Sequence, residues 1–283
     1  MTDSPVLRTI GLCARQEIAI AVRSRWTQLF AGVFGSLALA IAVSGYVLSG
    51  GSGIQDFART AASLIHLVLL VVPLASIVMG VLALTPERGA AELLYAQPVS
   101  RAAVLAGMLG GLFVALAAAE AVGFGAAGLV IFLQAGDEGL ASFLLVGLSA
   151  FALTAIFLAL AALVSVGQTG RRRAGALARA LVVWCALALV CDIVVFGVAS
   201  LLRSGHASRL LIVSALLNPI DAVRTGALLG VEGTGAFGPA SLALLRFTGG
   251  PLATAAVIAA SLALWILVPS LAAMRKLSRI DIA

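Results

Sequence analysis

Three ionisable side chains lie inside long apolar stretches of this 283-residue chain and are the first candidates for chemistry. Glu120 and Asp192 each fall near the middle of such a stretch, and His66 lies near the outer end of another. Charged groups in apolar surroundings are costly and usually face the interior of a helix bundle or a water-filled path. Two interpretations of the carboxyl groups stay open: a polar conduit or proton-linked pair, and hydrogen bonds that hold neighbouring helices together.

Signatures of soluble enzymes and of metal centres are missing from the sequence. There is no Walker A sequence, no His-Glu-x-x-His and no Gly-x-Ser-x-Gly. Two histidines are too few for a multi-histidine metal centre, and the three cysteines, Cys13, Cys185 and Cys191, follow no disulfide or metal-binding spacing. We therefore predict a non-catalytic chain that binds no metal and no other cofactor.

Six apolar stretches would position these residues, because each reaches the ~20 residues that a helix needs to cross a bilayer. They are Thr27–Leu48, Ala61–Leu84, Ala103–Gln134, Ala141–Val166, Leu181–Leu202 and Leu252–Ala273. The composition agrees, since 62% of the residues are hydrophobic and 11% charged, too few charges for the surface of a soluble domain. We expect an all-α integral membrane protein whose six transmembrane helices form one domain, residues 27–283.

The positions of lysine and arginine orient the six spans. With both termini on the inner side, most of the 18 basic residues lie on that side, including the run Arg171–Arg173. Basic residues favour the cytoplasmic side of short loops, so we expect a multi-pass protein with cytoplasmic termini. The net charge of +6 comes from residues at the ends of the spans and indicates a lipid bilayer as partner, not nucleic acid.

Two segments outside the spans have helical patterns of their own. In residues 1–26, the basic and amphipathic stretch Ile10–Trp26 is expected to lie along the inner leaflet and to run straight into the first span. The long outer segment, residues 203–250, contains a helix break at Asn218–Pro219 and a glycine-rich connector at Gly226–Gly238. This pattern predicts packed or partly re-entrant helices at the outer face.

The second loop, residues 85–102, carries the most specific local sequence. Pro86 can begin a helix, Glu87 suits its positive first turn, and Pro98 ends it. A short helix with apolar and aromatic residues beside charges would dock a soluble partner; a plain interfacial helix fits the same pattern. The candidate contact residues of this loop are Glu87, Arg88, Glu92, Leu93, Leu94, Tyr95 and Arg101.

A second specific element is the sequence Leu217–Arg224, whose polar residues surround the helix break. Asn218 or Asp221 can cap the turn after the break, and Arg224 follows Asp221 at a spacing that permits an ion pair. We expect an exposed pair, which adds only ~0–1 kcal/mol, so its role would be to fix the shape of a docking surface. The candidate docking residues are Asn218, Pro219, Asp221 and Arg224; a turn that only packs the outer loop is the alternative.

Small residues recur at every fourth position of the third span. They are Gly107, Gly111, Ala115, Ala119, Gly123 and Ala127. This spacing lets two helix backbones approach closely. The approach can occur within one subunit or between two.

Together these features resemble ABC-2-type transporter permeases. The resemblance lies in the basic N-terminal helix with Ser24–Trp26, the six spans, and the Glu-Arg-Gly and Gln-Pro-Val-Ser-Arg sequences of the second loop. It implies an ABC-2, type V exporter-like permease fold in the bacterial inner membrane. It also implies a homodimer bound to two copies of a cytoplasmic ABC ATPase, which would bind ATP and Mg and move the second loop while the permease hydrolyses nothing.

Within that family, Ser24–Trp26, Asp192 and the Leu217–Arg224 element resemble the permeases of the system that matures nitrous oxide reductase. This resemblance implies a periplasmic β-helical partner at the outer element. It also implies a part in assembling the copper–sulfur centre of the reductase, by export of a sulfur species or by mechanical transmission. Two alternatives remain: an ABC-2 exporter of a lipid or hydrophobic small molecule, and a proton-coupled carrier that uses Glu120 and Asp192.

Overall fold

The computed structural model describes residues 5–49, 54–85, 99–135, 140–166, 172–231 and 239–279, and all regular elements within these ranges are helical. The order is α1 (Pro5–Arg23), α2 (Arg25–Ser49), α3 (Ile54–Leu84), α5 (Arg101–Ala135), α6 (Leu140–Ser165), α7 (Arg173–Cys185), the π-helical turn η3 (Ala186–Val190), α8 (Cys191–Leu201), α9 (Ser204–Leu217), α10 (Pro219–Val231), α11 (Pro239–Thr248) and α12 (Pro251–Arg279). Helices suit an apolar chain in lipid, because they satisfy main-chain polar groups within one segment.

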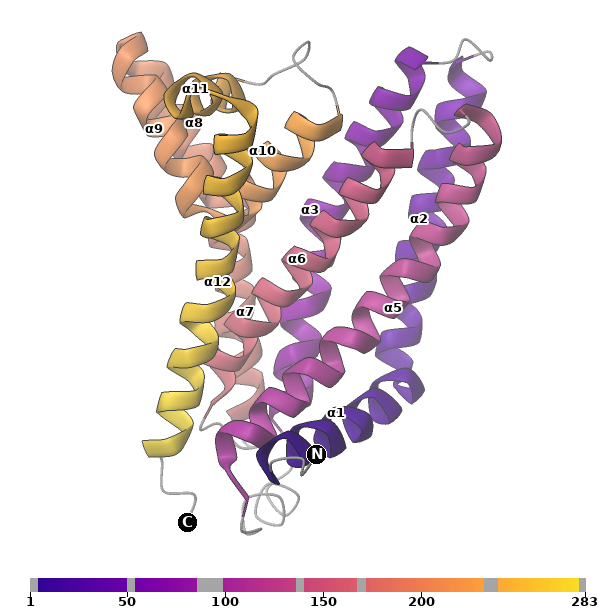
Figure 1. Cartoon of the computed structure of the whole chain (residues 1–283), viewed down its shortest axis with the longest axis vertical. Helices are drawn as coiled ribbons and strands as arrows, with labels where there is room; N and C mark the ends of the chain where they lie inside the picture. Colours follow the sequence, from indigo (N-terminus) through magenta and orange to yellow (C-terminus); the bar gives the residue numbers. More distant parts are fainter. Residues whose placement is uncertain are drawn as a thin grey trace.

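Within the described ranges, six helical segments are long and apolar enough to cross a membrane, which confirms the six expected spans. They are α2, α3, α5, α6, the continuous segment α7–η3–α8, and α12. Figure 1 shows them running along the long axis of the molecule, with α1 and the last turns of α12 at one end. We call this the α1 end; α9 and α11 lie at the opposite end.

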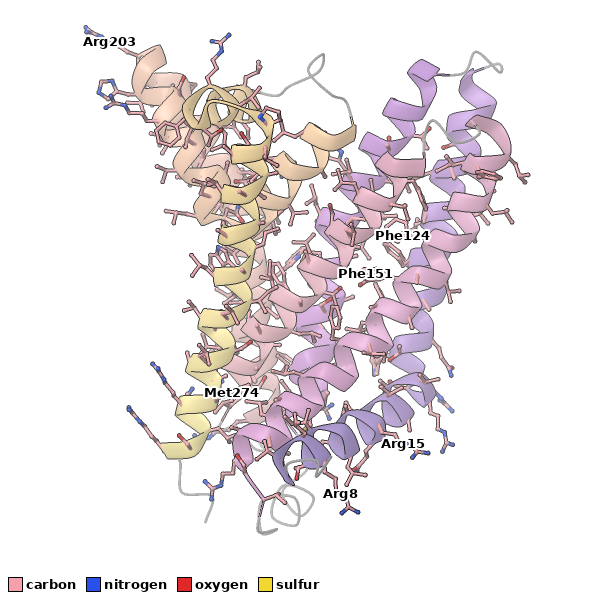
Figure 2. The ribbon with its side chains drawn as sticks, in the orientation of Figure 1. Arg8, Arg15, Phe124, Phe151, Arg203 and Met274 are labelled. Atoms are coloured by element: carbon pink, nitrogen blue, oxygen red, sulfur yellow. The ribbon has the colours of Figure 1, made fainter. Side chains whose placement is uncertain are left out.

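The N-terminal helix α1 lies across its end of the bundle instead of continuing the first span (Figure 1). As expected, it leads directly into the first span: α1 ends at Arg23, the main-chain nitrogen of Ser24 closes a tight turn on the Ala21 carbonyl at 3.1 Å, and α2 begins at Arg25. Arg8 and Arg15 point away from the bundle (Figure 2). Glu17 is buried on the inner face, and this burial raises its pKa above the ordinary value.

The fifth span begins earlier than the sequence indicated, at Arg173 instead of Leu181. The added turns are helical because Ala176 and Ala180 pack into the core, so this part of the chain is not a loop. The earlier start moves Asp192 from the middle of the span towards its far end. Span 5 below means the segment α7–η3–α8.

The outer segment forms three helices, α9, α10 and α11. The axes of α9 and α10 differ by 102° across the break at Asn218, as a re-entrant or broken span would. The glycine-rich connector does not begin at Gly226, because Gly226 and Gly230 lie within α10. At Gly230 an added Cβ would clash with the Leu145 side chain of α6, so the small residue permits close packing there. Residues 232–238 of the expected connector lie outside the described ranges.

Small residues and aromatic rings make the helix contacts of the core. Phe124 of α5 meets Phe34 of α2 and Phe143 of α6 edge to face, with ring centroids 5.2 and 5.7 Å apart. The small-residue stripe of the third span packs within the chain: Gly107 and Gly111 lie against α1, and Gly123 lies against α2. Of the two arrangements open from the sequence, these positions serve packing inside one subunit.

We predict that Gly111→Ala destabilises the protein, whereas Gly110→Ala does not. A Cβ at Gly111 would clash with the Ala14 carbonyl and lie 2.8 Å from the Glu17 Cβ, while a Cβ at Gly110 would meet nothing within 4 Å. Overpacking of this kind costs about 1–3 kcal/mol, and alanine in an open helical position is favoured over glycine by about 0.5–1 kcal/mol. Thermal unfolding in mild detergent measures both; equal melting temperatures would contradict the close packing of α1.

Candidate functional site

An ion-pair network joins span 5 to the bend between α9 and α10. Arg224 of α10 donates from Nη2 to Asp192 Oδ2 of α8 at 2.7 Å and lies 3.1 Å from Asp221 through Nη1. The expected Asp221–Arg224 ion pair is therefore present. The expectation that this pair is exposed is wrong, because the Asp221 and Arg224 side chains are only 12% and 26% exposed. Asp192 and the helices around the bend cover them.

Asn218 satisfies the polar groups that the helix break leaves open. Its Oδ1 accepts from the main-chain nitrogen of Ile220 at 3.1 Å, so Asn218 is the residue that caps α10. Its Nδ2 donates to the Leu187 carbonyl at 2.8 Å and to Asp221 Oδ2 at 3.3 Å. The Ser214 hydroxyl of α9 also donates to Asp221 Oδ2, at 2.8 Å. One asparagine thus links α9, α10 and span 5.

The π-helical turn η3 supplies the carbonyl that Asn218 uses. Its i→i+5 pattern accommodates an extra residue in an otherwise continuous helix, and such turns are frequent at functional sites. Leu187 lies within this turn, and Asp192 follows it in the first turn of α8. The sequence Ala186–Val190 contains neither proline nor glycine, so nothing in it indicated the turn. We name the group Leu187, Asp192, Ser214, Asn218, Asp221 and Arg224 the bend network.

A second, separate polar group lies in the core. The Thr154 hydroxyl of α6 donates to Glu120 Oε1 of α5 at 2.5 Å, and the Ser76 hydroxyl of α3 donates to Thr154 at 3.2 Å. All three side chains are fully buried. Glu120 Oε2 has no hydrogen-bond partner among the described residues. The group therefore joins three spans at a point closed to solvent.

The structure does not join Glu120 to Asp192. Each carboxyl group bonds to its own partners on other helices, Glu120 in the core and Asp192 in the bend network. This geometry favours interhelical hydrogen bonds over a directly linked carboxyl pair. His66 of α3 is exposed, so it lies apart from the buried Glu120 group.

The second loop is described only at its edges. Its candidate contact residues from Glu87 to Tyr95 lie outside the described ranges, whereas Arg101 begins α5 and is half-buried. The end of α3 and the start of α5, which flank the loop, lie at the α1 end (Figure 1). In the part of the chain that the structure describes, no three His, Cys, Asp or Glu side chains lie close enough to hold a metal ion.

Comparison with known proteins decides the family. The family described as ABC-2 family transporter protein matches residues 13–282. This chain belongs to the ABC-2 transporter family. One relative, named probable ABC transporter permease protein NosY, comes from Stutzerimonas stutzeri; it is 34% identical over 228 residues, 78% of this chain and 82% of the relative. A second, of the same name, comes from Pseudomonas aeruginosa and is 33% identical over 247 residues, 84% of this chain and 87% of the relative.

Membership makes the chain a multi-pass membrane permease subunit of an ABC transporter, a family whose permeases work with an ATPase partner. The end of α3 and the start of α5, which flank the second loop, lie at the α1 end, whereas α9 begins at the opposite end and runs back along the bundle to the bend (Figure 1). Any movement that starts at these flanks must pass along the spans to reach the bend.

We predict that Arg224→Ala lowers stability more than Asp192→Asn. Without Arg224, Asp192 and Asp221 lose their shared cation, whereas Asp192→Asn keeps the Asp221–Arg224 pair. The loss for Arg224→Ala is about 1–2 kcal/mol, because the hydrogen bonds are charged but partly screened by solvent. Unfolding followed by tryptophan fluorescence in mild detergent compares the two variants. A larger loss in Asp192→Asn would show that Arg224 does not organise the network.

We predict a different order for the core group: Glu120→Gln stays near the wild-type stability, and Glu120→Ala falls below it by about 2 kcal/mol or more. Glutamine keeps an oxygen that accepts from Thr154, whereas alanine removes the acceptor and leaves a cavity. The same unfolding experiment measures both. An equal loss in the two variants would mean that the negative charge of Glu120, and not its hydrogen bond, stabilises the core.

Proposed function

We propose that this chain is the permease of an ABC transporter that serves the maturation of nitrous oxide reductase. The observation that carries the proposal is the similarity to two NosY permeases, at 34% and 33% identity over most of each chain. The permease works as a homodimer with two ATPase copies at its second loops. It couples ATP hydrolysis to the outer face for assembly of the copper–sulfur centre, by export of a sulfur species or by mechanical transmission.

In this proposal the α1 end is cytoplasmic, the bend network faces the periplasm, and the membrane is the bacterial inner membrane. The exposed Arg8 and Arg15 of α1 support this orientation, because basic residues favour the cytoplasmic side. The periplasmic β-helical partner docks on the α9–α10 bend. The bend network supports a role in shaping that surface, since its charges bond to one another and leave little of each side chain for a partner.

A second candidate function is export of a lipid or hydrophobic small molecule. It is favoured by an apolar cavity of about 630 Å³ between α6, α10 and α12. Leu148, Val223 and Ile258 are among its lining residues, and Ser149 is its one hydroxyl-bearing residue. Such a cavity accepts apolar groups and offers little to a charged sulfur species.

The two functions differ in what the reductase contains when the permease fails. We expect a strain without this chain to make reductase that lacks the spectrum of the copper–sulfur centre, and the wild-type chain to restore it. Leu94→Asp/Tyr95→Asp should insert into the membrane but neither bind the ATPase nor restore the spectrum, because two carboxylates would disrupt an apolar contact. Membrane fractionation controls for insertion. Fully assembled reductase in the strain without the chain would overturn the maturation function and favour export.

A further inference from the structure

Arg173 joins the start of span 5 to the end of α3. Its Nη2 donates to the Leu82 carbonyl at 3.1 Å, although 91 residues separate the two in sequence. The last carbonyls of a helix have no partner within the helix and carry its negative dipole end, so a guanidinium is a favourable partner there. The preceding carbonyl, of Val81, accepts from the main-chain nitrogen and the hydroxyl of Thr85, at 3.1 and 2.6 Å.

The position of this contact matters because the second loop begins directly after it. α3 ends at Leu84, and the loop with the predicted ATPase contacts follows. The last turn of α3 and the first turn of α5 therefore flank the loop on its two sides. The bond from Arg173 connects the first of these turns to α7, and its guanidinium is part-buried.

Beyond its first turns, span 5 has no fully buried residue, although Trp184, Leu187 and Ala188 pack against the core while partly buried. Its only buried residues are Ala176 and Ala180, both on α7; η3 and α8 have none. At the far end, the Leu187 carbonyl accepts from Asn218, and Asp192 bonds to Arg224. Within one chain, polar bonds at the two ends of span 5 therefore join it to α3 and to the bend network.

The distance between the two sets of bonds matches the thickness of a membrane. Arg173 and Asp192 are 19 positions apart, so the helical rise places them roughly 28 Å apart along the axis, close to the ~30 Å of the hydrocarbon core. Span 5 is continuous over this distance, because its π-helical turn keeps the main-chain hydrogen bonds. One helix thus connects the end of α3 to the bend network.

We propose that Arg173 is the positioning residue through which span 5 transmits movement of the second loop to the α9–α10 bend. The proposal rests on the proposed function, in which an ATPase moves that loop. The chain of contacts runs from Leu82 to Arg173, along span 5 to Leu187 and Asp192, and from there to Asn218 and Arg224 on the bend. Arg173 contacts neither nucleotide nor cargo; it fixes the start of the helix that moves.

The adjacent arginine provides a matched control. Arg172 carries the same charge at the same membrane boundary, but it is exposed and makes no side-chain hydrogen bond with the described residues. Arg172→Gln and Arg173→Gln therefore remove equal charge, and only the second removes the bond to α3. Arg173→Lys keeps the charge and replaces the guanidinium.

The experiment measures movement of α9 in the purified permease–ATPase complex in lipid nanodiscs. The reporter is a fluorophore on Gly205→Cys, an exposed position where an added Cβ meets nothing within 4 Å, in a chain whose native cysteines are alanine. We expect ATP with vanadate to change the reporter signal in the wild-type background and in Arg172→Gln. In Arg173→Gln the ATPase should still co-purify and hydrolyse ATP, but the change should fall about tenfold.

The results of this experiment test the transmission role of Arg173 separately from the proposed function. A wild-type response in Arg173→Gln, or no response in the wild type, overturns the transmission role. Loss of the ATPase from Arg173→Gln also overturns it, since Arg173 would then hold the docking site. If Arg173→Gln does not insert, Arg173→Lys replaces it, and a full response in that variant shows that the guanidinium is not needed. If the ATPase does not bind even the wild type, the proposed function fails first, and this is seen before any variant is compared.

Discussion

A chain that spans a bilayer must satisfy its main-chain polar groups from within, and the rest of this structure follows from that requirement. Long helices meet it for most of the sequence, so the informative places are those where a helix stops. At Asn218 the side chain replaces what the break removes: it caps α10, and it bonds to a carbonyl of the π-helical turn. The 102° bend between α9 and α10 is therefore joined to span 5 by two side chains, Asn218 and Arg224.

The Glu120 group in the core and the bend network join helices that differ in how closely they are packed. The core group of Glu120, Thr154 and Ser76 joins α5, α6 and α3. In each of these spans, 50 to 56% of the residues in the most apolar stretch are buried. The bend network joins span 5 and α10. In the most apolar stretch of span 5, no residue is fully buried. Close packing resists relative movement of helices, whereas a few directional bonds allow a helix to move with its partner. The first group thus lies among closely packed spans, and the second joins helices that are less buried within one chain.

The sequence predicted what depends on local rules and missed what depends on packing. The six spans follow from length and hydropathy, the break from Asn218–Pro219, and the Asp221–Arg224 pair from helical spacing. The Asp192–Arg224 bond spans 32 positions and the Arg173–Leu82 bond 91, so neither has a local signal. The π-helical turn left no signal either. Hydropathy alone predicts a later start of span 5, because residues 173–180 are rich in arginine and small residues. Contact of Ala176 and Ala180 with the core stabilises the helix there.

The bonds within the bend network favour a role in positioning α9 and α10 over direct recognition of a partner. A polar surface that recognises a partner directly needs accessible donors and acceptors. Here Arg224, Asp221 and Asn218 bond to one another and to span 5, and Arg224 Nε, which has no partner among the described residues, is buried. Such bonds gain strength in surroundings of low dielectric constant, and they fix direction as well as distance. The network therefore determines where α9 and α10 lie relative to span 5. In the proposed function, a partner on that surface responds to the position of the bend, and through this position the permease transmits the work of an ATPase across the membrane.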